Sequence, residues 1–201
     1  GCSAQINPEI YKTMEQVDLI LGNEEKFKFE KYLSLLKNSS SGIAVNDIMS
    51  VKETANHFIS GFDKKARAFI QIQTGCDHRC TFCIIPFGRG NSRSVPVERI
   101  CKQIKILLEK GFKEIVLTGV DLTSYGNDIY KKIKLGGLIK EILTKVKHLE
   151  RLRLSSVDAI EIDKDLIDII SHEERLMPHL HLSIQSGDNT ILKRMKRRHS
   201  R

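Results

Sequence analysis

The sequence predicts an α/β fold with a parallel sheet, and two observations carry this prediction. From Arg67 onward, short apolar strand patterns alternate with longer amphipathic helix patterns. The connections between successive strand patterns are long enough to contain a helix, which parallel strands require. Repeated strand–helix units of this kind form either a barrel or a doubly wound sheet, with the helices outside.

Two different regions precede this repeat. Residues 1–36 contain a strand candidate at 17–21 and a helix candidate at 24–36. The helix candidate has three apolar positions: Phe27, Leu33 and Leu36. Residues 37–66 are rich in Ser, Asn and Gly and lack a sustained period, so we expect a linker there. The regular pattern fills the third region, 67–201.

The first strand and helix of the repeat have clear boundaries. Alternation of apolar and other side chains over 67–73 predicts a strand. Apolar residues spaced i, i+3, i+4 and i+7 predict a helix over 97–108. Ser94 is a candidate N-cap, and Pro96 suits the first helical turn. Gly111 marks the end of this helix.

The same cycle then repeats along the chain. Strands are predicted at 115–117, 152–154 and 180–184, and helices at 138–146 and 166–170. Each predicted strand ends in polar or Gly-rich residues, as expected where a barrel gathers its reactive groups. The four strand ends are Thr74-Gly75-Cys76, Gly119-Val-Asp121, Ser155-Ser156 and Gln185-Ser-Gly187.

Composition limits the class of protein. The 201 residues are 40% hydrophobic and 29% charged, which is ordinary for a globular domain. No apolar run approaches the roughly 20 residues of a membrane helix, and the first residues do not form a signal peptide. We therefore expect a cytoplasmic protein and no membrane partner. The chain does not begin with Met, so we expect a fragment.

The net charge favours a polyanionic partner. A formal charge of +8 is typical of proteins that bind nucleic acid, although many basic proteins do not. The basic run 193–201 is either part of such a contact or a solvated end.

Three cysteines lie within eight residues, spaced C-x3-C-x2-C: Cys76, Cys80 and Cys83. Thiols this crowded in a large chain are more typical of metal ligands than of disulfides. Three thiolates bind three corners of a [4Fe–4S] cluster and leave one iron open to a small molecule. The alternative is zinc, completed by His78 or another residue. We favour the cluster because of the spacing and its place after the first strand of the repeat.

The sequence around these cysteines resembles the radical S-adenosylmethionine (AdoMet) methylthiotransferases. The resemblance rests on the C-x3-C-x-aromatic-C motif and on the surrounding residues 73–93. Residues 116–126 (VLTGVDLTSYG) are most similar to the branch that modifies N6-threonylcarbamoyladenosine beside the tRNA anticodon. Residues 153–156 and 181–187 also match the family pattern, so the resemblance covers essentially the whole chain.

The resemblance implies a fold and a division into domains. Residues 67–201 would be a partial radical-AdoMet (β/α) barrel that lacks its last strands. Residues 1–36 would be the C-terminal part of a flavodoxin-like domain, and 37–66 the linker. A small RNA-binding β-domain, which the family carries at its C-terminal end, would follow beyond this sequence.

The resemblance also implies ligands. By similarity, the three clustered cysteines bind the [4Fe–4S] cluster that cleaves AdoMet. Phe82 would pack against the adenine of AdoMet, and Gly119, Ser155 and Gln185 would line the cofactor pocket. Cys2 resembles the last of three ligands of an auxiliary [4Fe–4S] cluster whose other two ligands lie upstream. No residue is assigned as an acid–base catalyst.

The implied reaction is 2-methylthiolation of a tRNA adenosine. An AdoMet-derived radical takes a hydrogen from an inert adenine carbon, a step that a cofactor must carry. Sulfur would come from the auxiliary cluster and the methyl group from a second AdoMet. The implied partners are tRNA, AdoMet and an electron donor. One thiolate cannot hold the auxiliary cluster, so we expect the isolated fragment not to complete the reaction.

Several alternatives remain at this stage. Within the same family, the substrate would be isopentenyladenosine in tRNA or an aspartate of a ribosomal protein. The chain would otherwise be an inactive remnant of the enzyme. If the metal is zinc, a nucleic-acid-binding module without catalysis would follow.

Five further residues have two interpretations each. Cys101 lies on the apolar stripe of its helix, which favours packing over metal ligation. His179 and His181 form an H-x-H pair, either a metal site or, as we favour, part of the barrel interior. Arg89 and Arg93 are either loop charges or contacts to AdoMet carboxylate or RNA phosphate.

Overall fold

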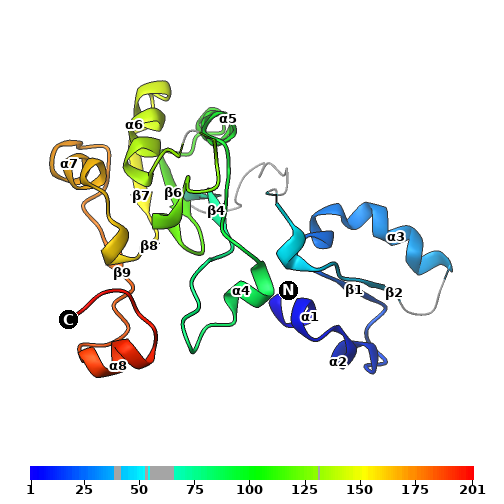
Figure 1. Cartoon of the computed structure of the whole chain (residues 1–201). Coiled ribbons are helices and arrows are strands. Elements are labelled where there is room, and N and C mark those ends of the chain that lie inside the picture. The colour runs from blue at the N-terminus through cyan, green and yellow to red at the C-terminus, as the bar shows by residue number, and fades with distance from the viewer. Residues whose placement is uncertain (39–41, 53, 55–65, 131) are drawn as a thin grey trace. The chain divides into compact units, whose positions relative to one another are not determined.

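The chain folds as two compact units (Figure 1). The first unit comprises residues 1–57 and 75–91, and the second comprises 58–74 and 92–201. The computed structural model describes residues 1–38, 42–52, 54, 66–130 and 132–201. Within those residues, no helix has the length and apolar character needed to cross a membrane.

A three-stranded parallel sheet forms the centre of the second unit. The sheet order is β3 (Arg67–Gln71), β6 (Glu114–Thr118) and β7 (Arg151–Leu154). Ala68 lies opposite Ile115, and Ile115 lies opposite Leu152, so fully buried side chains form one row across the sheet. The predicted parallel α/β sheet is therefore confirmed for these strands.

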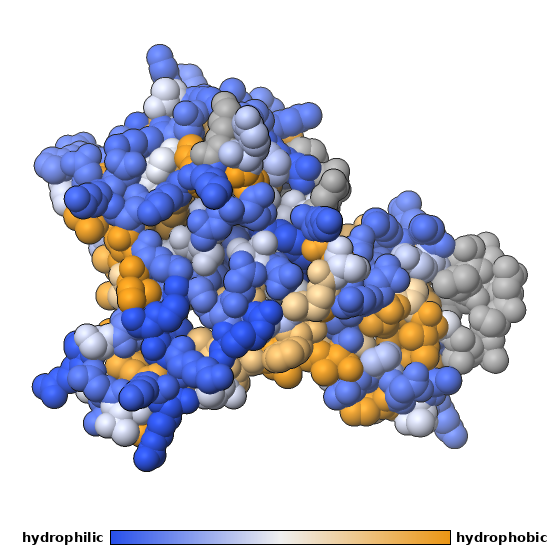
Figure 2. Space-filling model, viewed as in Figure 1, coloured by the Kyte–Doolittle hydropathy of each residue, from blue (hydrophilic) through white to orange (hydrophobic). Residues whose placement is uncertain are grey.

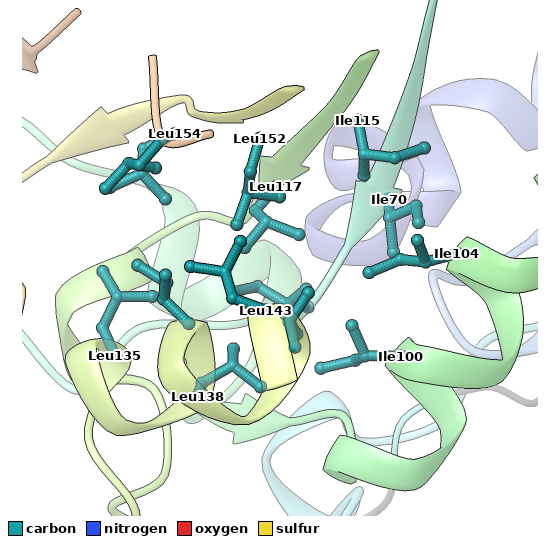
Figure 3. Packing of buried hydrophobic residues seen from close by; sticks show 14 of the residues in the cluster. Ile70, Ile100, Ile104, Ile115, Leu117, Leu135, Leu138, Leu143, Leu152 and Leu154 are labelled. Atoms are coloured by element: carbon teal, nitrogen blue, oxygen red, sulfur yellow. The ribbon is translucent and has the colours of Figure 1, made fainter. Parts of the chain in front are cut away.

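Two helices cover one face of this sheet: α5 (Val97–Glu109) and α6 (Leu135–Lys145). Figure 3 shows Ile100 and Ile104 of α5 and Leu138 of α6 directed toward Ile70 and Leu117 of the strands. A third helix, α7 (Lys164–His172), packs against α6. The apolar stripes that predicted these helices thus form the core.

Cys101 belongs to this core, as expected. It is 4% exposed and clusters with the apolar side chains of α5 and the sheet. Burial raises the pKa of its thiol, which keeps it protonated and unsuited to bind a metal.

The last predicted strand is shorter than expected. β9 (His181–Leu182) pairs in parallel with β8 (Ser156–Val157) rather than with β7. The backbone turns at both ends of β9, because His179 N donates to Met177 O (2.7 Å) and Ile184 N to Leu182 O (3.0 Å). These local bonds stop the ladder after two residues. The helix α8 (Asn189–Arg194) follows.

The start of α5 also differs from the expectation. Pro96 is the N-cap and makes no side-chain cap bond. Ser94 instead lies in β5 (Arg93–Ser94), which pairs antiparallel with β4 (Gln73–Thr74). Its hydroxyl donates to Asp128 Oδ1 (2.5 Å) and accepts from Gly126 N (2.8 Å). Ser94 therefore anchors the loop at 126–128 and cannot cap the helix.

The first unit contains two parallel strands, β1 (Leu19–Leu21) and β2 (Gly42–Ala44). Its helices are α1 (Cys2–Ile6), α2 (Pro8–Lys12), α3 (Phe29–Asn38) and α4 (Ile85–Arg89), with 3₁₀ turns η1 (Glu25–Lys28) and η2 (Ile48–Ser50). The segment expected to be an irregular linker therefore contributes a strand, since Ile20 pairs with Ile43.

The helix predicted at 24–36 is divided. Glu25 is 2% exposed and its carboxylate accepts from Asn46 N (3.3 Å), which draws the first turn inward as η1. Phe27 and Leu33, two apolar positions of the predicted helix, are 44% and 38% exposed. The side chain of Leu36 lies outside the described part of the chain.

Replacing Ile104 by Ala should destabilise the second unit. The residue is fully buried, so the loss of three methyl or methylene groups leaves a cavity and lowers the free energy of unfolding by about 2–5 kcal/mol. Ile167→Ala on α7 is the matched control, because Ile167 is 55% exposed and should cost less than about 0.5 kcal/mol. Urea unfolding of both variants measures the difference, and equal losses would contradict the assigned core.

Glu114 should make stability depend on pH. Arg153 donates a hydrogen bond to the Glu114 carboxylate (2.8 Å), and this bond lowers the pKa of Glu114. Burial raises that pKa, whereas the positive charges of Arg153, Arg67 and Arg151 lower it further. A carboxyl with a lowered folded pKa stabilises the fold above its unfolded value, about 4.3, and loses that contribution as the pH falls through the folded pKa.

The test is Glu114→Gln. We expect it to cost about 1.5–3 kcal/mol at pH 7, the typical value of a hydrogen bond to a charged group. We also expect a smaller loss of stability in acid than in the wild-type chain. Urea midpoints at pH 7 and below pH 4 measure both effects; a variant whose acid sensitivity equals that of wild type would disprove the role of Glu114.

Candidate functional site

The cysteines lie on a closed loop of the first unit, between Gly75 and Asn91. Gly75 has φ +75°, and a Cβ there would lie 1.9 Å from the Asn91 carbonyl oxygen. Cys76 N donates to Gly90 O at 3.0 Å. Only glycine allows this close approach, so Gly75 is the residue that lets the two ends of the loop meet.

The three cysteines of the motif lie on this loop, form no disulfide and are each partly exposed. Cys83 N donates to Cys80 O (3.0 Å), which makes a tight turn between them. Arg79 Nη1 donates to Cys76 O (3.2 Å) and braces the preceding turn. Soft, accessible thiolates held on one short loop are the donor set that an iron–sulfur cluster takes, so the residues present fit that group.

Large, exposed apolar side chains neighbour the cysteines in the sequence. Phe82, Ile84 and Phe87 are 53%, 54% and 56% exposed. An exposed phenyl ring between two cysteines of the sequence offers a flat surface to a planar ligand, and the role expected for Phe82 stays a prediction. His78 also lies close, with a ring nitrogen within 4.8 Å of Cys76 Sγ, so the zinc alternative retains one neighbouring pair of donors.

Cys2 lies against α4, the helix that follows Cys83 within the cysteine loop. A Cβ on Gly88 would lie 2.7 Å from Cys2 Cβ, so only glycine fits there. Asn23 donates through Nδ2 both to Cys2 Sγ (3.5 Å) and to Gly88 O. Burial raises the pKa of the Cys2 thiol, but hydrogen bonds from Asn23 and Arg89, with the charges of Arg89 and Lys26, outweigh it and lower the pKa.

Arg89 thus has a partner that the sequence did not indicate. It contacts the Cys2 thiol within the first unit, which neither of the two expected roles included. Asn23 was also missed, because a buried Asn at the end of a strand has no distinctive spacing in sequence.

In the second unit, the loop after β6 is fixed by Gln73. Its side chain is fully buried, and its Oε1 accepts from Val120 N (3.0 Å) and Asp121 N (2.9 Å). A Cβ on Gly119 would lie 3.1 Å from the same oxygen. Gly119 therefore starts a loop whose shape depends on Gln73.

The other two predicted pocket residues also follow strands. Ser155 comes directly after β7 and its N donates to Leu117 O at 3.0 Å. Gln185 comes three residues after β9 and has φ +69°, a left-handed conformation that side chains other than glycine rarely adopt. Such strained positions concentrate at functional sites.

The remaining candidates have structural partners or exposed positions. Arg93 is 7% exposed within β5. His181 Nδ1 lies 2.9 Å from Ser156 Oγ across the β8–β9 pair, and His179 is exposed. Two cations of the basic run, Arg197 and Arg198, form ion pairs with Asp158. The run is therefore not simply a solvated end.

The family of this chain follows from a match between most of its sequence and a known superfamily. Residues 70–201 match the radical SAM superfamily, and the chain belongs to that superfamily.

Similar proteins define the class further. The chain is 56% identical over 201 residues, its whole length and 47% of the relative, to the threonylcarbamoyladenosine tRNA methylthiotransferase MtaB of Rickettsia prowazekii. It is 42% identical to the same enzyme of Aquifex aeolicus, over all of this chain and 48% of that one. The tRNA-2-methylthio-N(6)-dimethylallyladenosine synthase of Clostridium perfringens (strain SM101) is 35% identical, over all of this chain and 45% of that one.

The resemblance drawn from the sequence is thus confirmed. The chain spans about half the length of the curated relatives it matches. A solved radical S-adenosylmethionine methyltransferase, TsrM from Kitasatospora setae, aligns with TM-score 0.42 at 19% identity, over 52% of this chain and 20% of that one. A likeness at this level carries no conclusion about this chain.

Gly75→Ala should prevent the loop from closing. The new Cβ meets the Asn91 carbonyl and the left-handed backbone is strained, so we expect most of the iron bound after anaerobic reconstitution to be lost. Gly111→Ala is the matched control, because Gly111 has φ +87° but nothing within 4 Å of its Cβ position. The Gly111→Ala variant should lose only about 1 kcal/mol of stability, from backbone strain, and should keep its iron. Iron per chain measures both; equal retention would contradict the role of Gly75.

Proposed function

We propose that this chain is part of a radical-AdoMet tRNA methylthiotransferase that 2-methylthiolates N6-threonylcarbamoyladenosine next to the anticodon. One observation carries the proposal: three cysteines with C-x3-C-x2-C spacing, none of them in a disulfide, lie on one closed loop in a chain of the radical SAM superfamily. The names of the most similar relatives support the reaction and the tRNA substrate.

The cysteine loop would hold the metal centre. Cys76, Cys80 and Cys83 would ligate a [4Fe–4S] cluster whose fourth iron would bind AdoMet. Once reduced by an electron donor, the cluster would supply the radical chemistry. Phe82, exposed beside these thiols, would stack on the adenine of AdoMet. The other pocket residues, Gly119, Ser155 and Gln185, would orient AdoMet from the strand ends.

Cys2 would belong to a second site. We assign it as the third ligand of an auxiliary [4Fe–4S] cluster that supplies sulfur, with the other two ligands upstream of this chain. The lowered pKa of its thiol supports this role, because the thiolate is the form that binds iron. Residues 1–36 would be the end of a flavodoxin-like domain, and the whole enzyme would act in the cytoplasm.

The identities favour the threonylcarbamoyladenosine substrate. Four similar enzymes named for that nucleoside are 56%, 42%, 36% and 34% identical to this chain, whereas those named for dimethylallyladenosine are 34–35% identical, so the two highest identities carry the preference. Isopentenyladenosine in tRNA is therefore the alternative substrate. No residue of the described chain carries this distinction by its own geometry.

Removing one thiol tests the metal site. Cys80→Ala leaves two ligands, so after anaerobic reconstitution we expect loss of the visible iron–sulfur absorption and no 5′-deoxyadenosine on adding dithionite and AdoMet. Cys101→Ala is the matched control: it removes a buried core thiol and should keep both signals, at a cost of stability only. A Cys80→Ala chain that still forms 5′-deoxyadenosine would refute the assignment, and a colourless wild-type chain that retains zinc would favour the zinc module.

A labelled tRNA tests the substrate. When the adenine C2 hydrogen is replaced by deuterium, we expect 5′-deoxyadenosine to acquire deuterium from tRNA with threonylcarbamoyladenosine and not from tRNA with isopentenyladenosine. Mass spectrometry of the product measures this without requiring sulfur insertion. Transfer only from the isopentenyladenosine tRNA would move the assignment to the alternative substrate.

A further inference from the structure

A buried carboxylate organises the C-terminal edge of the second unit. Asp158 directly follows β8, and its side chain is 9% exposed. Arg197 Nη2 lies 3.0 Å and Arg198 Nη2 3.1 Å from Asp158 Oδ2. The Arg197 side chain is 8% exposed, so this is a buried ion pair between segments 39 positions apart. A buried charge is tolerated only when its partners are fixed, so both segments must be held in place.

The same C-terminal segment holds the turn that precedes Gln185. Arg197 Nη2 also donates to Ser183 O at 2.7 Å, and His199 Nε2 lies 3.0 Å from Ile184 O, where it acts as a donor. These are the two carbonyls immediately before the left-handed Gln185. The turn therefore depends on side chains from residues 197–199 in addition to its own backbone.

A third loop joins this network. Arg198 Nη1 pairs with Glu161 Oε1, and Glu161 Oε2 accepts from Thr123 Oγ1 (3.1 Å) and Ser124 Oγ (3.3 Å). The same two hydroxyl oxygens lie 3.2 and 2.7 Å from the carboxylate of Asp121, so each shares its one proton between the two carboxylates. The loop that begins at Gly119 is thus tied to the C-terminal segment through side chains alone.

We propose that Arg197, Arg198 and His199 form a clasp that positions the three loops bearing Gly119, Ser155 and Gln185 for AdoMet. Within the second unit, the clasp joins loop 119–124, loop 155–161 and turn 183–185, each of which carries one predicted pocket residue. This role rests on the proposed function, because it takes AdoMet as the ligand of those loops. The three residues are positioning residues and touch no ligand themselves.

The clasp explains why some basic residues of the run 193–201 are exposed and others are buried. Lys193, Arg194, Lys196 and Arg201 are exposed, whereas the side chains of Arg197 and His199 are 8% and 11% exposed. Figure 2 shows a predominantly hydrophilic surface over α8 and the C-terminal residues, at the lower left. Charge that serves only solubility or nucleic-acid binding would lie on that surface and would not be buried on a carboxylate.

The test compares Arg197 and His199, whose side chains are 8% and 11% exposed, with the exposed Arg194. Arg197→Met removes the ion pair and the bond to Ser183 O, and Arg194→Met removes an equal charge from an exposed position on α8. We expect the affinity of the reconstituted chain for AdoMet to fall about 10- to 100-fold in Arg197→Met and to stay within about twofold in Arg194→Met. His199→Phe should lose about 3- to 10-fold, and His199→Gln, which keeps an N–H donor, should recover most of it.

Hydrogen exchange of the chain without AdoMet is the second measurement. Amides of residues 183–187 should exchange faster in Arg197→Met and His199→Phe and at the wild-type rate in Arg194→Met. Wild-type exchange and AdoMet affinity in folded Arg197→Met and His199→Phe would overturn the clasp. If wild-type chain with an intact cluster binds no AdoMet, the proposed function fails and the clasp's role in AdoMet binding fails with it. Faster exchange at 183–187 without loss of AdoMet affinity would overturn the clasp alone.

Discussion

The parallel register of β3, β6 and β7 is the constraint on which the second unit depends. Because the three strands run the same way, their C-terminal ends meet at one edge of the sheet, and the residues after them lie near one another. Ile115 pairs with both neighbours, so a shift of one residue would turn the buried row of the sheet outward. The helices α5 and α6 fix that register by packing on this row.

Buried polar side chains then shape the loops at that edge. Gln73 is fully buried and uses one oxygen to hold two amides of the loop after β6. Asp158 is the corresponding group after β8, held by two arginines. Polar groups in such places cost several kcal/mol if left unpaired, so each one restricts the loop to the conformation that satisfies it. The loops are therefore preorganised by groups that contribute little to the apolar core.

Much of this architecture was predictable from periodicity. The stripe over 97–108 and the apolar run at 115–117 each require burial on one side, and the structure forms both elements at those positions. The α-helix predicted at 24–36 begins only at Phe29, because its pattern could not reveal that Glu25 turns inward and that the first turn is 3₁₀. The strand at 180–184 was too long because the backbone bonds at Met177 and Leu182 that end it are local turns without a Gly or Asn signal.

The candidate site also contains residues that the sequence indicates and residues that it does not. The three cysteines were evident because their spacing alone restricts the chemistry. Asn23, Gln73 and the clasp residues were not, and the partner of Arg89 was missed, because each acts through a contact between positions far apart in sequence and single residues of these types are common. The sequence shows glycines at positions 75 and 88 but does not show why glycine is required there. The reason is the close approach of another segment, which only the three-dimensional structure reveals.

The central claim is that the three thiols hold a cluster with one open iron. Electron paramagnetic resonance of the anaerobically reconstituted and reduced chain, with and without AdoMet, tests it most directly. We expect a [4Fe–4S]⁺ signal that shifts when AdoMet is added, because AdoMet changes the coordination of the open iron. A cluster signal that AdoMet leaves unchanged, or a reduced protein without any signal, would contradict the account.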